Sequence, residues 1–191
     1  MNLWIFGFCL TGYFILHSVL ADTSIKEQLY GLIPIRYYRL FYNATSVGGL
    51  IFLLWMFRQL PVDRLFMVPS WIGGMLMAIG SLLLFLALRN YDLGEFSGTH
   101  QLANNGNTPN HSLNTSGLNA IVRHPLYTAS FFLFWGFFLY SPTLKSLCFS
   151  GIASLYLIIG TRLEEQKLVG VFGEEYSDYQ KRVGQFLPKI S

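Results

Sequence analysis

Apolar residues in this chain gather into five long runs that polar links separate. A helix of about 20 such residues rises about 30 Å, enough to cross the core of a bilayer. We therefore predict five transmembrane helices, over residues 3–20, 40–57, 70–88, 125–141 and 144–161. The last two are separated by Ser141-Pro142-Thr143, where the proline cannot continue a helix and predicts a tight hairpin.

The polar links carry signals of their own. Asp22 and Ser24 can cap a short helix that Pro34 would end. Residues 89–122 form the one long polar segment, which predicts a loop that is functional or disordered. Residues 162–191 form a charged tail that includes an amphipathic-looking helix. In the third run, a face of mostly small residues comprises Gly73, Gly74, Met77, Ala78 and Ser81. The spacing of Gly74 and Ala78 on it predicts close contact between helices.

Composition supports a membrane protein of a single domain. The 191 residues are 52% hydrophobic, 17% aromatic and only 12% charged, which is too apolar for an ordinary soluble domain. We predict an all-α integral membrane protein with the lipid bilayer as its surroundings and with no nucleic-acid or obligate protein partner. A bacterial inner membrane and the endoplasmic reticulum both fit. Cys9 and Cys148 lie in apolar runs, so no metal site is expected.

The positive charges predict the orientation of the helices. If the amino terminus lies outside, ten cations fall on the inner side and three on the outer side. The inner set is Lys26, Arg36, Arg39, Arg89, Arg123, Arg162, Lys167, Lys181, Arg182 and Lys189, and the outer set is Arg58, Arg64 and Lys145. Because cations favour the cytoplasmic face, the polar loop and the charged tail should both be cytoplasmic.

Candidate chemistry lies at the two open ends of the predicted hairpin. Pro125 should begin a helix, because the residue before a proline favours extended backbone. The hairpin then returns Glu164 and Glu165 to the level of Arg123 and Tyr127. Backbone amides at a helix start attract an anion, and carboxylates attract cations or hydroxyl groups. A ligand that carries both kinds of group would fit there.

A histidine within the first run is a weaker candidate. His17 follows Tyr13 at helical spacing, and an ionisable residue inside a membrane is a functional candidate by default. Hydrogen bonding to a neighbouring helix is nevertheless the commoner use of such a residue, and we favour it.

The second half of the chain resembles a known family. The motifs are His111-x-Leu-x-Thr-Ser-Gly, Arg123-His-Pro-x-Tyr127, Glu164-Glu165, Phe172-Gly-Glu-Glu-Tyr176-x-x-Tyr179 and a closing Phe-Leu-Pro188. In this order they resemble the isoprenylcysteine carboxyl methyltransferases, which are multi-spanning membrane enzymes. The resemblance implies S-adenosylmethionine as the cofactor, in a cytoplasmic pocket made by the polar loop, the hairpin and the last helix. The implied cofactor contacts are His111, Ser112, Leu113, Asn114, His124, Pro125, Leu126, Tyr127, Glu164 and Glu165.

Departures from that family bear on the substrate. Gly160 stands where those enzymes place an arginine for the substrate carboxylate, and Asn119 replaces a tyrosine. Several stretches instead resemble membrane enzymes that S-methylate small thiols such as methanethiol. These are Leu16-His-Ser, Tyr38-Arg-Leu-Phe-Tyr-Asn, Asp92-x-x-x-Phe96-x-Gly98 and Arg162-Leu-Glu-Glu.

We therefore predict methyl transfer to a small, lipophilic thiol. Arg123 and Arg162 are the catalytic candidates, because a nearby cation favours the thiolate. Methylation of an isoprenylcysteine carboxylate remains an alternative. Two further alternatives are a sterol-type reductase that uses NADPH, which shares the Arg-His-Pro-x-Tyr pattern, and a non-catalytic membrane scaffold.

Overall fold

The computed structural model describes residues 1–89 and 113–189, and every regular element in these ranges is a helix. The helices are α1 (Leu3–Ala21), α2 (Thr23–Leu29), α3 (Ile35–Arg58), α4 (Ser70–Leu88), the short 3₁₀ helix η1 (Gly117–Ala120), α7 (Pro125–Tyr140), α8 (Leu144–Phe172) and α9 (Glu174–Arg182). The predicted all-α class is confirmed. Most of the predicted polar loop, residues 90–112, lies outside the described residues.

Four of these helices, α1, α3, α4 and α8, are long and apolar enough to cross a membrane. The fifth apolar helix, α7, has 16 residues. Large apolar side chains are exposed along these helices; Trp4 is 84% exposed and Phe8 is 80% exposed. Such surfaces suit lipid chains rather than water. The chain is therefore a multi-pass integral membrane protein.

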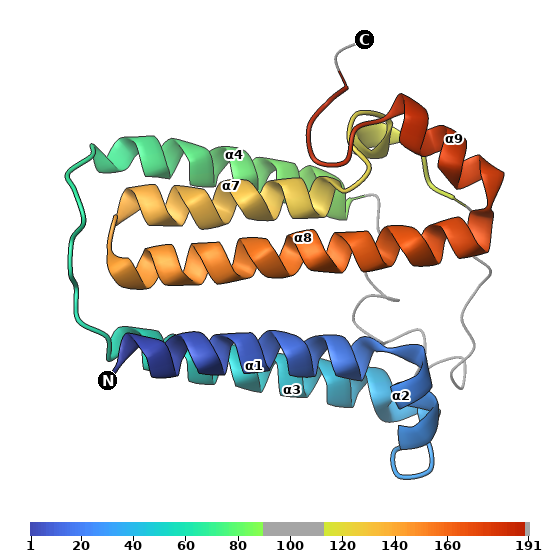
Figure 1. Ribbon diagram of the computed structural model, residues 1–191, viewed down its shortest axis with the longest axis horizontal. Coiled ribbons are helices and arrows are strands. Elements are labelled where there is room, and N and C mark those ends of the chain that lie inside the picture. Colours follow the sequence, from blue (N-terminus) through green and yellow to red (C-terminus); the bar gives the residue numbers. More distant parts are fainter. Residues whose placement is uncertain (90–112, 190–191) are drawn as a thin grey trace. The chain divides into compact units, whose positions relative to one another are not determined.

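The chain folds as two units, and the first contains α1, α2 and α3. Figure 1 shows α1 and α3 side by side. Near the start of α1, the ring of Phe6 meets that of Phe57 edge-on at 5.7 Å. Further along, Tyr13 lies over Gly49, where an added Cβ would come within 2.7 Å of the tyrosine ring.

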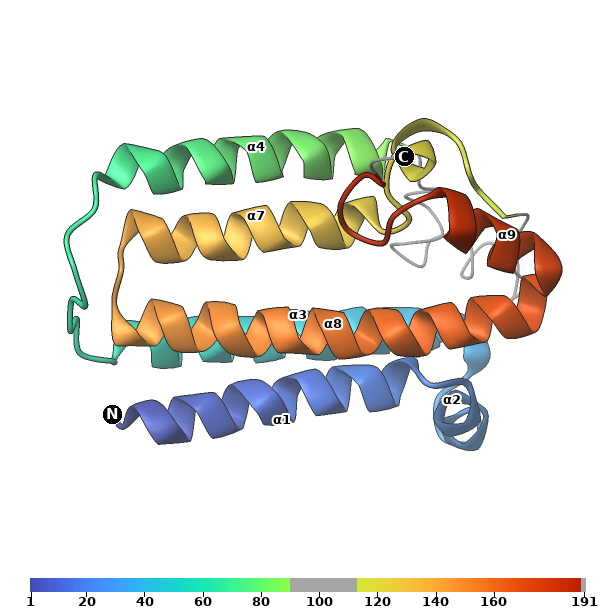
Figure 2. The ribbon, with the colours of Figure 1, turned by 45° about the horizontal axis from the view of Figure 1, so that its top comes forward.

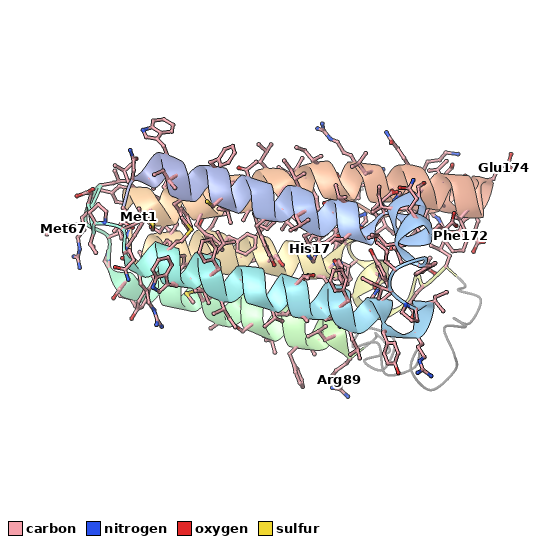
Figure 3. The ribbon with its side chains drawn as sticks, turned by 90° about the horizontal axis from the view of Figure 1, so that it is seen from below. Met1, His17, Met67, Arg89, Phe172 and Glu174 are labelled. Carbon is pink, nitrogen blue, oxygen red and sulfur yellow. The ribbon has the colours of Figure 1, made fainter. Side chains whose placement is uncertain are left out.

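His17 on α1 (Figure 3) is held by two residues of α3. The hydroxyl of Ser46 donates its proton to the carbonyl of Tyr42 at 2.8 Å. Toward His17 Nδ1, 3.0 Å away, it can therefore act only as an acceptor. The other ring nitrogen, Nε2, then accepts from the Tyr42 hydroxyl at 2.7 Å. Both nitrogens are engaged, which supports our interpretation of His17 as a packing residue.

The polar stretch after α1 folds partly as predicted. The Asp22 side chain accepts from the backbone N–H of Ser24 at 3.0 Å and caps α2, as expected. That helix ends at Leu29, however, and Pro34 stands at the start of α3 instead of at the end of α2. A proline suits this position, because the first turn of a helix needs no N–H donor from it. The helix that contains the second predicted span therefore begins at Ile35.

The second unit contains α4, α7, α8 and α9, and its three long helices lie side by side in Figures 1 and 2. Glycines bring α4 and α7 into backbone contact. An added Cβ on Gly73 would lie 2.6 Å from the carbonyl oxygen of Gly136, and one on Gly80 would lie 2.9 Å from that of Ala129. Small residues allow this approach where apolar burial from water cannot drive association.

The face of α4 that makes this contact agrees only in part with the predicted one. Ala78 is exposed, and nothing lies within 4 Å of a Cβ added to Gly74. The contact uses Gly73 and Gly80, which are seven residues apart and so lie on one side of the helix. The predicted face was therefore right at Gly73 and wrong at Gly74 and Ala78.

Polar side chains join α7 to α8. Thr143 and Ser146 cap the start of α8 reciprocally. Further along the hairpin, Ser150 donates to the carbonyl of Phe134 at 2.6 Å, and the indole of Trp135 donates to Ser154 at 3.1 Å. Hydrogen bonds between helices of this kind fix the rotation of one against the other in lipid.

Helix α8 continues well past residue 161, where the fifth span was expected to end. It reaches Phe172 and stops at Gly173, whose φ of 57° is a glycine conformation. Figure 3 marks Phe172 and Glu174, which flank this turn into α9. Glu164 and Glu165 consequently lie inside a helix, about two turns before its end.

Replacing Gly73 with alanine should lower the stability of the protein. The new methyl group would collide with α7 backbone, and overpacking of this kind costs about 1 to 3 kcal/mol. Gly74→Ala is the matched control, since its methyl group meets nothing. Thermal unfolding in detergent micelles should show a lower melting temperature for Gly73→Ala alone. Equal melting temperatures for the two variants would contradict the packing described.

Candidate functional site

Glu165 on α8 connects three segments of the second unit. Its Oε1 accepts from Arg123 Nε at 2.7 Å and from His124 Nε2 at 3.0 Å, and Arg123 Nη2 lies 2.7 Å from the same oxygen. Its Oε2 accepts from the side-chain amide of Gln180 on α9, at 3.0 Å. We call Arg123, His124, Glu165 and Gln180 the Glu165 cluster.

Arg123 has further contacts that hold the end of α9. Its Nη1 donates to the backbone carbonyls of Gln180, at 3.3 Å, and of Val183. The side chain is only 10% exposed. Because Glu165 compensates its charge and backbone carbonyls take its other donors, this guanidinium fixes the geometry of the site.

The end of the chain is bound to the start of α7. The backbone N–H groups of Arg123 and His124 donate to the carbonyls of Gly184 (2.8 Å) and Gln185 (3.1 Å). The hydroxyl of Thr128 donates to the carbonyl of Phe186 at 2.9 Å. Figures 1 and 2 show this C-terminal segment, in red, beside the start of α7. Two of the amides expected to face a ligand anion are therefore already bonded.

Glu164 differs from its neighbour in its surroundings. Consecutive residues on a helix point about 100° apart, so Glu164 faces Tyr127 on α7, whose hydroxyl donates to Oε2 at 2.7 Å. His124 Nδ1 lies 3.9 Å from the same oxygen. The Glu164 side chain is 45% exposed, against 14% for Glu165. Glu164 is therefore the more accessible carboxylate of the two.

Two tyrosines of α9 also belong to the site; the sequence analysis included them in a family motif but not among the implied cofactor contacts. The Tyr179 hydroxyl donates to the carbonyl of Asn119 and so ties α9 to η1. The Tyr176 hydroxyl is buried, with no hydrogen-bond partner among the described residues. Burial raises the pKa of Tyr176, and the charge of Glu165 adds to this, so the hydroxyl stays protonated. Their spacing of three on one helix face was the available signal.

The remaining predicted residues are more scattered. Arg162 is exposed and lines a hollow of about 390 Å³ with Glu165, Gln166, Val169 and Gln180, on another side of α8 from Glu164. Among the described residues, Asn114 bonds only within its own turn, accepting from Ser116. Leu113 is half-buried, as is Leu126 beside the buried Pro125. His111 and Ser112 lie outside the described residues.

An apolar groove adjoins the cluster. It has a volume of about 350 Å³ and is lined by Leu76, Thr128, Phe131, Phe132, Trp135, Phe186 and Leu187. The ring of Phe186 lies 6.2 Å from the ring of His124. Aromatic walls of this kind suit a small apolar group rather than a charged one.

Comparison with known proteins shows a family match over almost the whole chain. The family described as NnrU protein matches residues 5–188. The methanethiol S-methyltransferase of Pseudomonas deceptionensis is 31% identical over 95% of this chain and 71% of its own length. That of Crocosphaera subtropica is 28% identical over 95% of this chain and 73% of its own length.

A more distant relative covers only part of the chain. The protein-S-isoprenylcysteine O-methyltransferase of Homo sapiens is 33% identical over 49% of this chain and 34% of its own length. The resemblance drawn from the motifs, including that to the small-thiol enzymes, is therefore confirmed. No solved structure matches this chain.

Removing the charge of Glu165 should destabilise the second unit. Glu165→Gln would leave the mostly buried Arg123 without its carboxylate, and breaking such a pair costs roughly 3 kcal/mol. Glu164→Gln, one residue away and much more exposed, should cost less than about 1 kcal/mol. Chemical denaturation in detergent would compare the two. Similar losses would mean that the cluster does not carry the stability of the site.

Proposed function

This chain belongs to the NnrU protein family, and from that premise we propose that it transfers a methyl group from S-adenosylmethionine to a small thiol. Its relatives are methyltransferases, and this chain is a methyltransferase of the same membrane class. The observation that carries the proposal is the exposed Glu164 carboxylate, held by Tyr127 beside His124 at the end of a membrane hairpin.

The residues at this site fit the chemistry of S-adenosylmethionine. That molecule offers an ammonium group and ribose hydroxyls as donors. Glu164 is an exposed acceptor for these groups, and the Tyr127 hydroxyl holds it in place at 2.7 Å. Hydrogen bonds to a charged acceptor are the strong ones. When bound, the cofactor supplies an electrophilic methyl group on a sulfonium.

The residues of the chain contribute orientation more than acid–base chemistry at the methyl group. Tyr127 holds Glu164 in place, and the Glu165 cluster holds His124. Methyl transfer needs the nucleophile, the carbon and the departing sulfur in line, and a fixed, dry site supplies that alignment. We propose that α9 and the C-terminal segment serve to keep water from one side of the site.

Two features support a thiol as the methyl acceptor. Among the described residues, those that line the apolar groove beside Phe186 include no charged side chain that could bind a substrate carboxylate. Position 160 holds a glycine, so the arginine that would bind a substrate carboxylate there is lacking. Nothing lies within 4 Å of a Cβ added to Gly160. The small-thiol enzymes are also the relatives that match over 95% of this chain.

The site should lie on the cytoplasmic side of the membrane. Ten of the thirteen lysines and arginines fall on that side when five spans begin with the amino terminus outside. In this orientation the donor is drawn from the cytoplasm, and an apolar thiol can reach the site from the bilayer. Leu113 and Asn114 remain predicted cofactor contacts, as do residues 125–126.

A direct assay tests the proposed activity. The purified chain in detergent would be given S-adenosylmethionine and a short alkyl thiol, and the methyl thioether would be measured in the headspace. We expect thioether formation and no methyl ester from a farnesylcysteine analogue. The reverse result would refute the thiol assignment. Stabilisation by NADPH and not by S-adenosylmethionine would refute the methyltransferase assignment itself.

Glu164→Gln should weaken cofactor binding without unfolding the protein. The change removes a charged acceptor, so the affinity for S-adenosylmethionine should fall roughly tenfold to a hundredfold, or about 1.5 to 3 kcal/mol. Tyr127→Phe, which only frees the carboxylate from its donor, should have a smaller effect. Calorimetric titration of each variant gives the affinity directly. Unchanged affinity in Glu164→Gln would place the cofactor elsewhere.

A further inference from the structure

The two ring nitrogens of His124 have different partners. Nε2 lies 3.0 Å from Glu165 Oε1, an oxygen that also takes the donors of Arg123. A carboxylate can only accept, so Nε2 carries a proton. In the neutral imidazole, Nδ1 then bears a lone pair. This nitrogen lies 3.9 Å from Glu164 Oε2, which is beyond hydrogen-bond distance.

Nδ1 and Glu164 Oε2 are two acceptors 3.9 Å apart, and Oε2 also accepts from the Tyr127 hydroxyl. A donor group that lies between them can bond to either one. The charged and titratable groups that face His124 are Arg123 on its own loop, Tyr127 on α7, and Glu164 and Glu165 on α8. The imidazole itself is buried, with 6% of its side chain exposed.

We propose that His124 is the general base that takes the proton of the thiol substrate at Nδ1; this rests on the proposed function. The S–H bond breaks and its proton passes to Nδ1. The sulfur lone pair then forms the new bond to the methyl carbon, while the carbon–sulfonium bond breaks and leaves its electron pair on the donor sulfur. Glu165, through Nε2, and Glu164, beside Nδ1, stabilise the imidazolium that results. Its proton is afterwards lost to water.

The chemistry requires such a base. Thiols such as cysteine have a pKa near 8.5, so at neutral pH most of the substrate holds its proton and reacts poorly. Neither arginine can accept a proton. A histidine oriented by a carboxylate is the usual solution for activating a weak nucleophile. His124, with Glu165 behind it, has that arrangement within one unit of this chain.

His124→Gln is the informative variant. A glutamine amide can still donate to Glu165 in place of Nε2, so the Glu165 cluster keeps its bond, but no basic nitrogen remains. We expect the affinity for S-adenosylmethionine, measured by calorimetry, to stay within about threefold of wild type. Methylation of an unsubstituted alkyl thiol at neutral pH should fall by roughly 10²- to 10⁴-fold.

Two thiols of similar size separate a base from a structural residue. One is an unsubstituted alkyl thiol, and the other carries an electron-withdrawing ester that lowers its pKa. In the wild type, the rise of kcat/KM with pH should have the same midpoint for both thiols. In His124→Gln the rise should follow the pKa of each thiol, and activity should recover at high pH, because hydroxide then supplies the thiolate.

The outcomes are distinct. A wild-type pH profile whose midpoint tracks the pKa of the thiol would overturn the proposal, and this test does not depend on the variant folding. An equal loss for both thiols at every pH, or a parallel loss of cofactor affinity, would also overturn it in favour of a positioning or cofactor-binding role. If the wild type bound S-adenosylmethionine but methylated no thiol, the thiol assignment of the proposed function would be refuted, and the role of His124 as a base for a thiol would be refuted with it.

Discussion

The pairing of Glu165 with Arg123 is the constraint on which the rest of the site depends. Both side chains are mostly buried, at 14% and 10% exposure, and each would be costly to leave alone. The net gain in stability from such a pair is small, but the penalty for any arrangement that separates them is large. The pair therefore selects one geometry. Around it, His124 donates to the same oxygen that Arg123 contacts, and Gln180 donates to the other oxygen of Glu165.

The two adjacent glutamates face different neighbours because a helix turns about 100° per residue. Glu165 points toward the loop and α9, where protein donors surround it. Glu164 points toward Tyr127 and is more exposed. Two glutamates that are adjacent in sequence thus have different surroundings, and we propose a binding role for Glu164 alone. The same rotation separates Arg162 from Glu164 and directs it to the hollow beside Gln180.

The packing of the apolar helices α4, α7 and α8 depends on other interactions than the site does. In lipid, apolar burial does not favour one helix arrangement over another, so contact rests on shape and on a few hydrogen bonds. Gly73 and Gly80 let α4 approach the backbone of α7, and Ser150 bonds the carbonyl of Phe134 across the hairpin. These contacts fix the level at which Tyr127 meets Glu164, some 37 residues away in the chain. The precision of the site thus begins in the packing below it.

The sequence predicted the helical class, the hairpin at Pro142 and the meeting of Arg123 with the glutamates, because apolar runs and prolines act locally. Prediction from the sequence failed where the structure depends on contact with another segment. The sequence alone does not distinguish Gly73 from Gly74, because only the contact with α7 shows which face of α4 is buried. Helix α8 extends to Phe172, past the length that a membrane requires, because no residue before Gly173 ends it. The bonds of Gly184 and Gln185 to the loop follow no periodic pattern. No sequence signal showed that Nε2 of His124 would be bonded to Glu165 while Nδ1 would lie 3.9 Å from Glu164.

The C-terminal segment has a consequence for the order of assembly. Its bonds to Arg123, His124 and Thr128 join residues about 60 positions apart, and α9 must turn back before they can form. Loop closure over that distance comes late. The hairpin of α7 and α8 can therefore be in place while the site is still open. The reverse step is a partial opening, in which α9 and the last residues detach and the membrane helices stay packed. Amide hydrogens at Arg123 and His124 would exchange with solvent in that state long before those of the hairpin.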